Sequence, residues 1–282
     1  MGFFAFLKKK NDSSVIEKTE QEKEIEKEAT KKKEIEEDKE EETSPAYQKA
    51  LDYIEEFNKT LENLREYPVN IEDKFEEMKE PEKETKYSNI TAKTKLESFN
   101  DFVVIDTETT GLRSSSAIVE ISAIRFVDMK PVEIFTSLTS TSSKLSDKII
   151  DLTGITNDML SDKPKFKQIA RSLVDFIGKS PIVGHNLPFD IGVIENKGVY
   201  FEKNKKYDTL KLAKKILKTP KYKYDKELGF RDIDYNYDYD IDSYSLDDIC
   251  RYYGIYRDSA HRASSDCLAT GYLFIELLDE II

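Results

Sequence analysis

Three short apolar runs that begin at Phe102 constrain the fold more than any other feature of this sequence. They cover residues 102–105, 118–127 and 132–138, and turn-forming residues separate them. Apolar runs of this length between turn signals are typical of strands, and consecutive strands joined by short turns predict an antiparallel meander. Because helical spacing governs much of the chain that follows, the sequence predicts an α/β fold, a mixed sheet flanked by helices.

The remainder of the second half alternates helical spacing with one short strand. That strand is 181–183, a wholly apolar run that we expect to be buried. Residues 219–244 are rich in Tyr and Asp, and we interpret them as a structural insertion, since their aspartates would repel the phosphates of a nucleic acid whose bases the tyrosines could stack. The predicted helices lie around 148–152, 166–177, 189–197, 209–217, 245–253 and 266–278.

The first hundred residues differ in composition from the rest. Residues 17–42 alternate Glu and Lys with almost no apolar stripe, so we expect residues 1–43 to be an extension that is disordered or a solvated helix. Residues 44–67 place apolar side chains at helical spacing and predict an amphipathic helix, whose partner could be the C-terminal domain, another copy of the chain or a different protein. Residues 68–98 return to polar character and are predicted to link this helix to a domain over 99–282.

Charge is distributed unevenly as well. The formal net charge is -12, of which residues 1–100 carry -8 and residues 101–282 carry -4. An acidic total argues against a nucleic-acid partner, but binding depends on local charge. The stretch 203–226 could follow a phosphate backbone, although a solvated helix face explains such a run equally well. Its lysines include Lys205, Lys206, Lys211, Lys214, Lys215, Lys218, Lys221 and Lys223.

Cysteines and the first residues indicate the compartment. Cys250 and Cys267 form no CxxC pair and have no histidine cluster near them, so neither a zinc site nor a disulfide framework is expected. A cytoplasmic location fits best, because the cytoplasm is reducing. Residues 1–7 are apolar but too short to span a bilayer, and no transmembrane segment is expected.

Four acidic residues stand where predicted elements begin or end. Asp106 and Glu108 follow the first strand, and alternate side chains of an extended chain share a face, so both point the same way. Asp190 lies in the first turn of one predicted helix and Asp266 near the start of the last. A cap or a surface turn would explain each of them alone, but together they form an ordered series.

That series continues through several supporting motifs. It consists of Asp106-Thr107-Glu108-Thr109-Thr110-Gly111-Leu112, Gly154-Ile155-Thr156, Gly184-His185-Asn186, Asp190, Tyr207-Asp208-Thr209-Leu210, His261 and Asp266. In these residues the sequence resembles the DEDDh exonucleases, the family that includes the epsilon proofreading subunit of bacterial DNA polymerase III. The resemblance covers residues 101 to about 280 and implies a ribonuclease-H-like fold. It departs from the family in the N-terminal extension and in the insertion.

The resemblance implies a metal-dependent 3′→5′ exonuclease that releases nucleoside 5′-monophosphates. Asp106, Glu108, Asp190 and Asp266 would bind two divalent ions, Mg²⁺ or Mn²⁺, which prefer carboxylate oxygens. His261 would be the general base for the attacking water, because the ordinary pKa of an imidazole lies near neutrality.

Substrate contacts are implied by the same resemblance. Leu112 and Phe189 would pack against the terminal base or sugar, with core packing as the alternative, and the backbone near Thr109 would meet the 3′-hydroxyl. His185 and Asn186 are assigned to the substrate site too, and we interpret His185 mainly as a hydrogen-bonded scaffold.

Three functions compete at this stage. The leading hypothesis is removal of nucleotides from DNA 3′ ends in proofreading or repair. An RNA 3′→5′ exonuclease would use identical chemistry, and contacts to the 2′-hydroxyl that motifs do not reveal would distinguish it. A non-catalytic nucleic-acid or polymerase-binding module would predict loss of a ligand, whereas all five key residues are present. The N-terminal region could bind a DNA polymerase or another replication protein.

Overall fold

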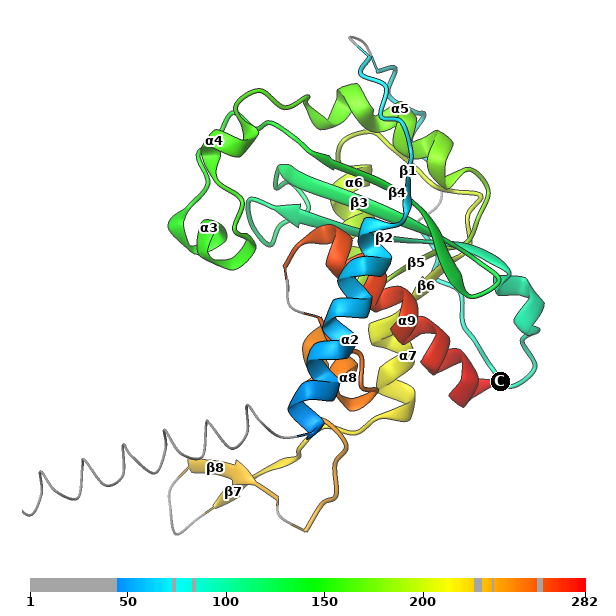
Figure 1. Cartoon of the computed structure of the whole chain (residues 1–282), viewed down its shortest axis with the longest axis vertical. Helices are drawn as coiled ribbons and strands as arrows, with labels where there is room; N and C mark the ends of the chain where they lie inside the picture. Colours follow the sequence, from blue (N-terminus) through cyan, green and yellow to red (C-terminus); the bar gives the residue numbers. More distant parts are fainter. Residues whose placement is uncertain (1–44, 73–74, 83–84, 226–229, 235, 258–260) are drawn as a thin grey trace, which may run out of the picture. The chain divides into compact units, whose positions relative to one another are not determined.

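Six strands form one mixed sheet at the centre of the fold (Figure 1). The computed structural model of the chain describes residues 45–72, 75–82, 85–225, 230–234, 236–257 and 261–282. Residues Asp52–Ile282 form one compact unit, and the sheet belongs to it. The α/β class expected from the sequence, with helices flanking a mixed sheet, is confirmed. The charged extension expected over 1–43 lies outside the described residues.

The middle of the sheet is the antiparallel meander that the apolar runs predict. It consists of β2 (Asp101–Thr109), β3 (Ile118–Val127) and β4 (Lys130–Leu138), paired in that order. Parallel strands extend it on both sides. On one side β5 (Ile182–Gly184) pairs with β2 and β6 (Lys206–Asp208) pairs with β5, and on the other β1 (Arg65–Glu66) pairs with β4. The sequence did not predict β1 or β6, because both are very short and contain charged residues.

Helices connect and cover these strands. Ser146, Thr156 and Ser245 set the starts of three of them, since each side chain accepts a hydrogen bond from the first turn. None of the helices in the described residues combines the length and apolar character that a membrane span requires. The described helices are α2 (Pro45–Glu62), the short 3₁₀ helix η1 (Leu96–Phe99), α3 (Asp147–Thr153), α4 (Asn157–Leu160), α5 (Phe166–Ile177), α6 (Leu187–Glu195), α7 (Thr209–Ile216), α8 (Leu246–Tyr252) and α9 (Ala263–Ile281).

Alternating side chains of the central strands build a separate core on each face of the sheet. On β2, Phe102 and Val104 belong to the core that includes α9, whereas Val103 and Ile105 belong to the core that includes α5 and α6. Successive residues of a strand point to opposite faces, so one continuous apolar run serves both cores. In Figure 1, α5 and α9 accordingly lie on opposite sides of the sheet.

The segment 68–98, which we expected to be a linker, packs along the domain. The N–H of Ser88 donates to the carbonyl of Lys206, and Ile90 is 2% exposed. Apolar residues from this segment also cover the core beneath α5, namely Val69, Phe75 and Tyr87. They are too sparse to show a period in the sequence, so composition alone does not predict these contacts.

The Tyr- and Asp-rich insertion contains a second, two-stranded sheet formed by β7 (Tyr222–Asp225) and β8 (Phe230–Ile233). Within it, Lys223 forms an ion pair with Asp234 at 3.0 Å. The ammonium of Lys221 lies 3.9 Å from the centre of the Tyr237 ring. These contacts are internal to the insertion, and its structural role stays a prediction.

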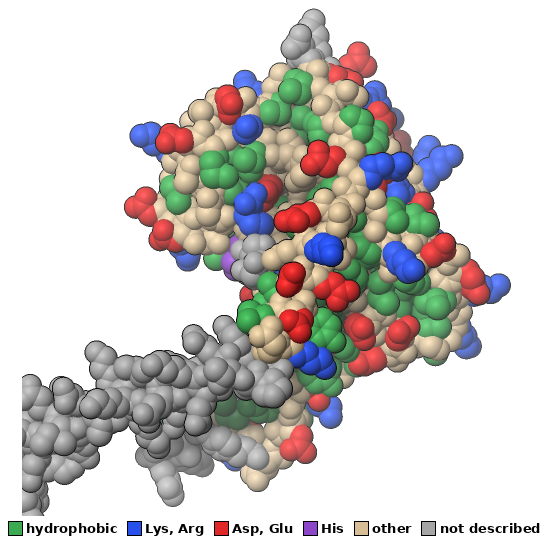
Figure 2. Space-filling model, in the orientation of Figure 1, with side chains coloured by type: hydrophobic (Ala, Val, Ile, Leu, Met, Phe, Trp, Pro, Cys, Tyr) green, Lys and Arg blue, Asp and Glu red, His purple; other side chains and the backbone are tan. Residues whose placement is uncertain are grey.

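Not every lysine of the stretch 203–226 lies at the surface. Lys206 is 2% exposed, and its ammonium donates to the carbonyls of Phe201 and Asn204. Burial lowers the pKa of Lys206, and this side chain is not available to a phosphate. On the face drawn in Figure 2, Lys and Arg side chains are interspersed with Asp and Glu.

Candidate active site

The C-terminal end of β2 presents polar side chains to both faces of the sheet. Asp106 and Glu108 continue the alternation of Phe102 and Val104, so they point to the face that α9 covers. Thr107, between them, points to the opposite face, toward α6. The strand thus offers two carboxylates on one side and a hydroxyl on the other.

Asp190 lies in the first turn of α6, as expected, and its carboxylate points back to β2. Its Oδ1 accepts hydrogen bonds from the N–H of Thr107 at 3.0 Å and from the hydroxyl of Thr107 at 2.6 Å. The backbone donor is available because β5 pairs with β2 only at Val103 and Val104, before this point. With 4% of its surface exposed, Asp190 is fixed beside the two carboxylates of β2.

Gly184 and Asn186 shape the turn that brings α6 to this position. A Cβ on Gly184 would lie 2.8 Å from a side-chain carbon of Leu187 and 3.2 Å from the carbonyl oxygen of Ile105, so a side chain here would push β5 away from β2. Asn186 has a φ of 58°, a left-handed conformation that Asn adopts more readily than most residues. Its N–H donates to the carboxylate of Asp208 at 3.0 Å.

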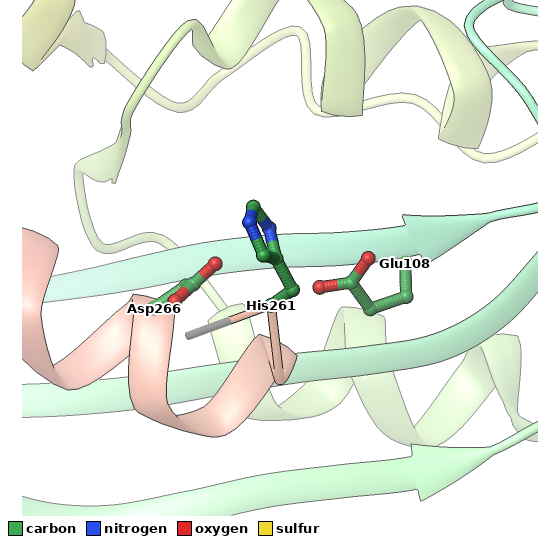
Figure 3. A group of neighbouring side chains, drawn as sticks. All are labelled: Glu108, His261 and Asp266. Carbon is green, nitrogen blue, oxygen red and sulfur yellow. The ribbon is translucent and has the colours of Figure 1, made fainter. Parts of the chain in front are cut away.

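Glu108, His261 and Asp266 meet on the α9 face. Each offers one ligand atom, and these atoms lie within 4.8 Å of one another. Figure 3 shows the three side chains converging from β2, from the turn that precedes α9 and from the first turn of α9. The close group does not include Asp106 or Asp190, which adjoin it from β2 and α6.

Burial and mutual repulsion raise the pKa of the carboxyl groups in this site. Burial, and then the nearby Glu120, raise the pKa of Glu108 to about 7. Burial also raises the pKa of Asp190 to about 7, against the lowering effect of its hydrogen bonds from Thr107. For Asp106, burial followed by the charges of Asp190 and Glu108 raises the pKa well above its ordinary range. Ionising all of them together therefore costs free energy in the absence of a cation.

The repulsion between these carboxylates should make the thermal unfolding midpoint depend on pH, and it should do so differently in EDTA and in Mg²⁺. Because these pKa values are higher in the folded than in the unfolded chain, the folded state holds more protons between about pH 4 and 7, and this contribution to stability is lost as the pH rises through that window. Mg²⁺ at about 100 times its dissociation constant should raise the midpoint by about 5–10 °C at pH 8. At pH 5 we expect less than half of that increase. Equal increases at both values would contradict the expectation.

Arg257 is a charged residue of this site that the sequence motifs did not indicate. Its side chain is 5% exposed and forms ion pairs with Asp266 and, at 2.6 Å, with Asp247. The contact with Asp266 lacks hydrogen-bond geometry, so Oδ1 of Asp266 has no hydrogen-bond partner among the described residues. Asp266, although paired with Arg257, lies beside other carboxylates of raised pKa, and oxygen donors of this kind suit a divalent cation. Arg257 lowers the pKa of Asp106 and, after Arg262, that of Glu108, and so reduces the cost of ionising this cluster when no cation is bound.

His185 has the hydrogen bonds of a scaffold residue. Its Nδ1 lies 3.0 Å from the hydroxyl of Thr209, and its Nε2 lies 3.1 Å from the carbonyl oxygen of Tyr244. Burial lowers its pKa. Both ring nitrogens are thus occupied within the protein, in agreement with our interpretation of this histidine.

The other residues assigned to the substrate differ in exposure. Leu112 is 94% exposed, so the alternative of core packing is wrong for it. Phe189 is half-buried and packs against the core beneath α5. Thr109 is buried, and its hydroxyl donates to the carbonyl of Gly111 at 2.6 Å. Asn186 is exposed beside the turn. Their contacts with a substrate stay predictions.

Comparisons with known proteins give the family of this chain. PolC-type DNA polymerase III of Bacillus cereus is 31% identical over 186 residues, which are 64% of this chain and 12% of that protein. The same protein of Oceanobacillus iheyensis is 32% identical over 187 residues, again 64% of this chain and 12% of the relative. The chain therefore spans a small part of the length of these relatives.

Solved structures with a similar fold include exonucleases. Exonuclease X in complex with 5′ overhanging duplex DNA aligns over 64% of this chain and 92% of its own, with a TM-score of 0.45 and 23% identity. E. coli exonuclease I in complex with a dT13 oligonucleotide aligns over 64% and 41%, with a TM-score of 0.48 and 20% identity. The RNase_T family, described as "Exonuclease", matches residues 103–274, more than half of the sequence. The chain belongs to this exonuclease family.

Proposed function

We propose that this protein is a metal-dependent 3′→5′ exonuclease that hydrolyses the terminal phosphodiester bond of DNA and releases nucleoside 5′-monophosphates, in proofreading or repair. The observation that carries the proposal is the convergence of acidic groups and an imidazole from separate segments. Asp106 and Glu108 come from β2, Asp190 from α6, and His261 and Asp266 from the start of α9. Membership of the exonuclease family supports the same reaction.

The four carboxylates are the proposed ligands of two divalent ions, Mg²⁺ or Mn²⁺. Their oxygen donors suit hard cations, and burial raises the pKa values of Glu108 and Asp190, so a cation would lower the cost of ionising them together. When bound, such ions supply positive charge that stabilises the developing charge on the phosphate and lowers the pKa of the attacking water.

The chain's own residues are proposed to hold the substrate and move the proton. His261 accepts the proton of the attacking water, since its ring lies beside Glu108 and Asp266 and a neutral imidazole nitrogen can take a proton near neutral pH. Thr107 holds Asp190 in place through two hydrogen bonds. Leu112, almost fully exposed next to the site, is available to contact the terminal nucleotide.

DNA is the proposed substrate because the relatives found by sequence are DNA polymerases. We propose residues 99–282 as the exonuclease domain and residues 1–67 as the region that contacts a DNA polymerase or another replication protein. A cytoplasmic location is proposed with them, as replication takes place there in bacteria such as those of the relatives.

A nuclease assay tests the proposal. The full-length protein is incubated with 5′-labelled DNA and RNA oligomers in Mg²⁺, Mn²⁺ or EDTA, alongside Asp106→Ala. We expect a ladder that shortens from the 3′ end of DNA, only with metal and only in the wild type, with RNA degraded at least about tenfold more slowly.

Each alternative has its own outcome in this assay. Faster decay of RNA would replace the DNA substrate with RNA. Binding of both oligomers without any shortening in either metal would indicate a non-catalytic module. Equal decay with Asp106→Ala would point to a contaminating nuclease and would contradict the proposed site.

A further inference from the structure

Glu120 is a buried charged residue that the proposed reaction does not use. It lies on β3 between apolar neighbours and is 2% exposed. An ionised carboxylate in such a place requires compensating donors, because burial without them costs several kcal/mol. In the register of β2 and β3, Glu120 is directly opposite Glu108, a proposed metal ligand. The two carboxylates repel each other, so Glu108 does not compensate the charge of Glu120.

The compensation comes from the residues that directly follow His261. Arg262 donates from Nε to Oε2 of Glu120 at 3.1 Å and from Nη2 to Oε1 at 2.8 Å. The N–H of Ala263 donates to Oε2 at 3.0 Å. Both oxygens of Glu120 are thus engaged by a two-pronged guanidinium contact and a backbone donor, which is the arrangement that fixes position and orientation most strongly. We call this group of three residues the Glu120 clamp.

His261 needs such a restraint. Its φ is 60°, in the left-handed region, which costs a non-glycine residue roughly 1 kcal/mol. His261 comes directly before Arg262, the residue that precedes α9. Its ring must lie within a few ångströms of Glu108 and Asp266. The residue that follows it is tied to a neighbouring strand through a side chain 142 positions away in the sequence.

We propose that the Glu120 clamp positions His261 for catalysis, with Glu120 and Arg262 as positioning residues that touch neither substrate nor metal. The inference rests on the proposed function, in which His261 is the general base. Because both oxygens of Glu120 are occupied, the clamp acts through the backbone of residues 261–263 rather than as an additional ligand. Loosening it lets the imidazole leave its productive position, and a misplacement of about 1 Å is enough to cost about 100-fold in rate.

Steady-state kinetics of the full-length protein tests this. Glu120→Gln and Arg262→Gln should each lower kcat by about 10- to 100-fold, with KM changed less than about threefold. The buried Glu120→Gln variant could fail to fold. Arg262 is partly exposed, so we expect Arg262→Gln to fold and to test the clamp in that case. In a His261→Ala background the same substitutions should change the residual rate by less than about twofold, because residues that act through His261 have no further effect once it is removed.

Arg125→Gln is the matched control. Arg125 lies on the same strand and also forms a partly buried ion pair, with Asp101, but it contacts no residue of the candidate site. It should lose comparable thermal stability and keep its kcat. If Arg125→Gln lost as much kcat as Arg262→Gln, general destabilisation would explain the result and the clamp would be refuted.

Histidine NMR gives a readout that a purely structural role would not move. The chain has two histidines, so protein without a polyhistidine tag shows two imidazole signals, which His261→Ala assigns. Arg262→Gln should shift or broaden the His261 signal and leave that of His185, held by Thr209 and Tyr244, in place. An unmoved His261 signal overturns the proposal, as does an equal loss of kcat with and without His261.

The proposed function can fail separately. Wild-type activity in His261→Ala would remove the general base from the mechanism, whatever the clamp variants do. Loss of activity in His261→Ala together with wild-type kcat in Arg262→Gln would leave the function intact and refute only the clamp.

Discussion

Asp190→Asn is expected to lower exonuclease activity by about 1,000-fold or more while it raises the stability of the metal-free protein. An Asn side chain keeps an oxygen that can accept both hydrogen bonds from Thr107, so the turn into α6 should be retained. What is lost is one negative charge from a proposed cation site, and charge stabilisation of this kind carries a large share of catalysis. The same loss relieves the repulsion that raises the pKa of Asp106. Activity and stability should therefore change in opposite directions.

The measurement is kcat in Mg²⁺ together with the unfolding midpoint in EDTA at pH 8. Asp101→Asn is the control, because Asp101 is an exposed aspartate at the N-terminal end of β2, away from the site, where it accepts hydrogen bonds from Arg125 and Ser180. It should leave activity unchanged. Lower stability of Asp190→Asn in EDTA would show that the hydrogen bonds, and not the charge, dominate at this position.

Local periodicity explains which elements could be predicted from the sequence. The limits of β3 and α5 agree with the predicted 118–127 and 166–177, because β3 is a long, almost wholly buried apolar run and α5 repeats one buried face over twelve residues. β6 has three residues and a buried lysine, and its place is set by pairing with β5 rather than by its own pattern. Segment 68–98 is attached through single contacts such as Ile90, which no periodicity reveals.

The candidate site shows the same division. Its acidic residues could be predicted because they recur in a fixed chain order at the ends of elements, and the structure brings Glu108, His261 and Asp266 together. Arg257 could not be predicted from the sequence, because it is a single arginine in a loop and only the tertiary fold places it beside Asp266. Glu120 did leave a signal, since it is the acidic residue inside the apolar run 118–127, and a carboxylate in a buried strand requires a partner from elsewhere.

Close packing between α9 and β3 is a further property that the sequence hides, and it leads to a second large effect. Gly271→Ala should destabilise the protein by about 2–4 kcal/mol and lower the unfolding midpoint by roughly 5–15 °C. A Cβ at this position would lie 2.1 Å from a ring carbon of Phe126. That ring is fully buried and stacked on Phe102 at a centroid distance of 4.9 Å, so it cannot move aside without disturbing the core. Thermal or urea unfolding measures the change.

Gly192→Ala supplies the comparison that isolates this steric cause. Gly192 also lies within a helix, α6, but the nearest atom to its added Cβ would be the Cβ of Ser114 at 3.8 Å, an ordinary contact. Alanine is favoured over glycine in a helix by about 1 kcal/mol, so this variant should be as stable as the wild type or slightly more so. The same preference acts at Gly271 and must be outweighed there by the overlap with Phe126. If both variants gained stability, α9 would have room to shift on the sheet, and the tight contact between Gly271 and Phe126 would not be what sets the distance between them.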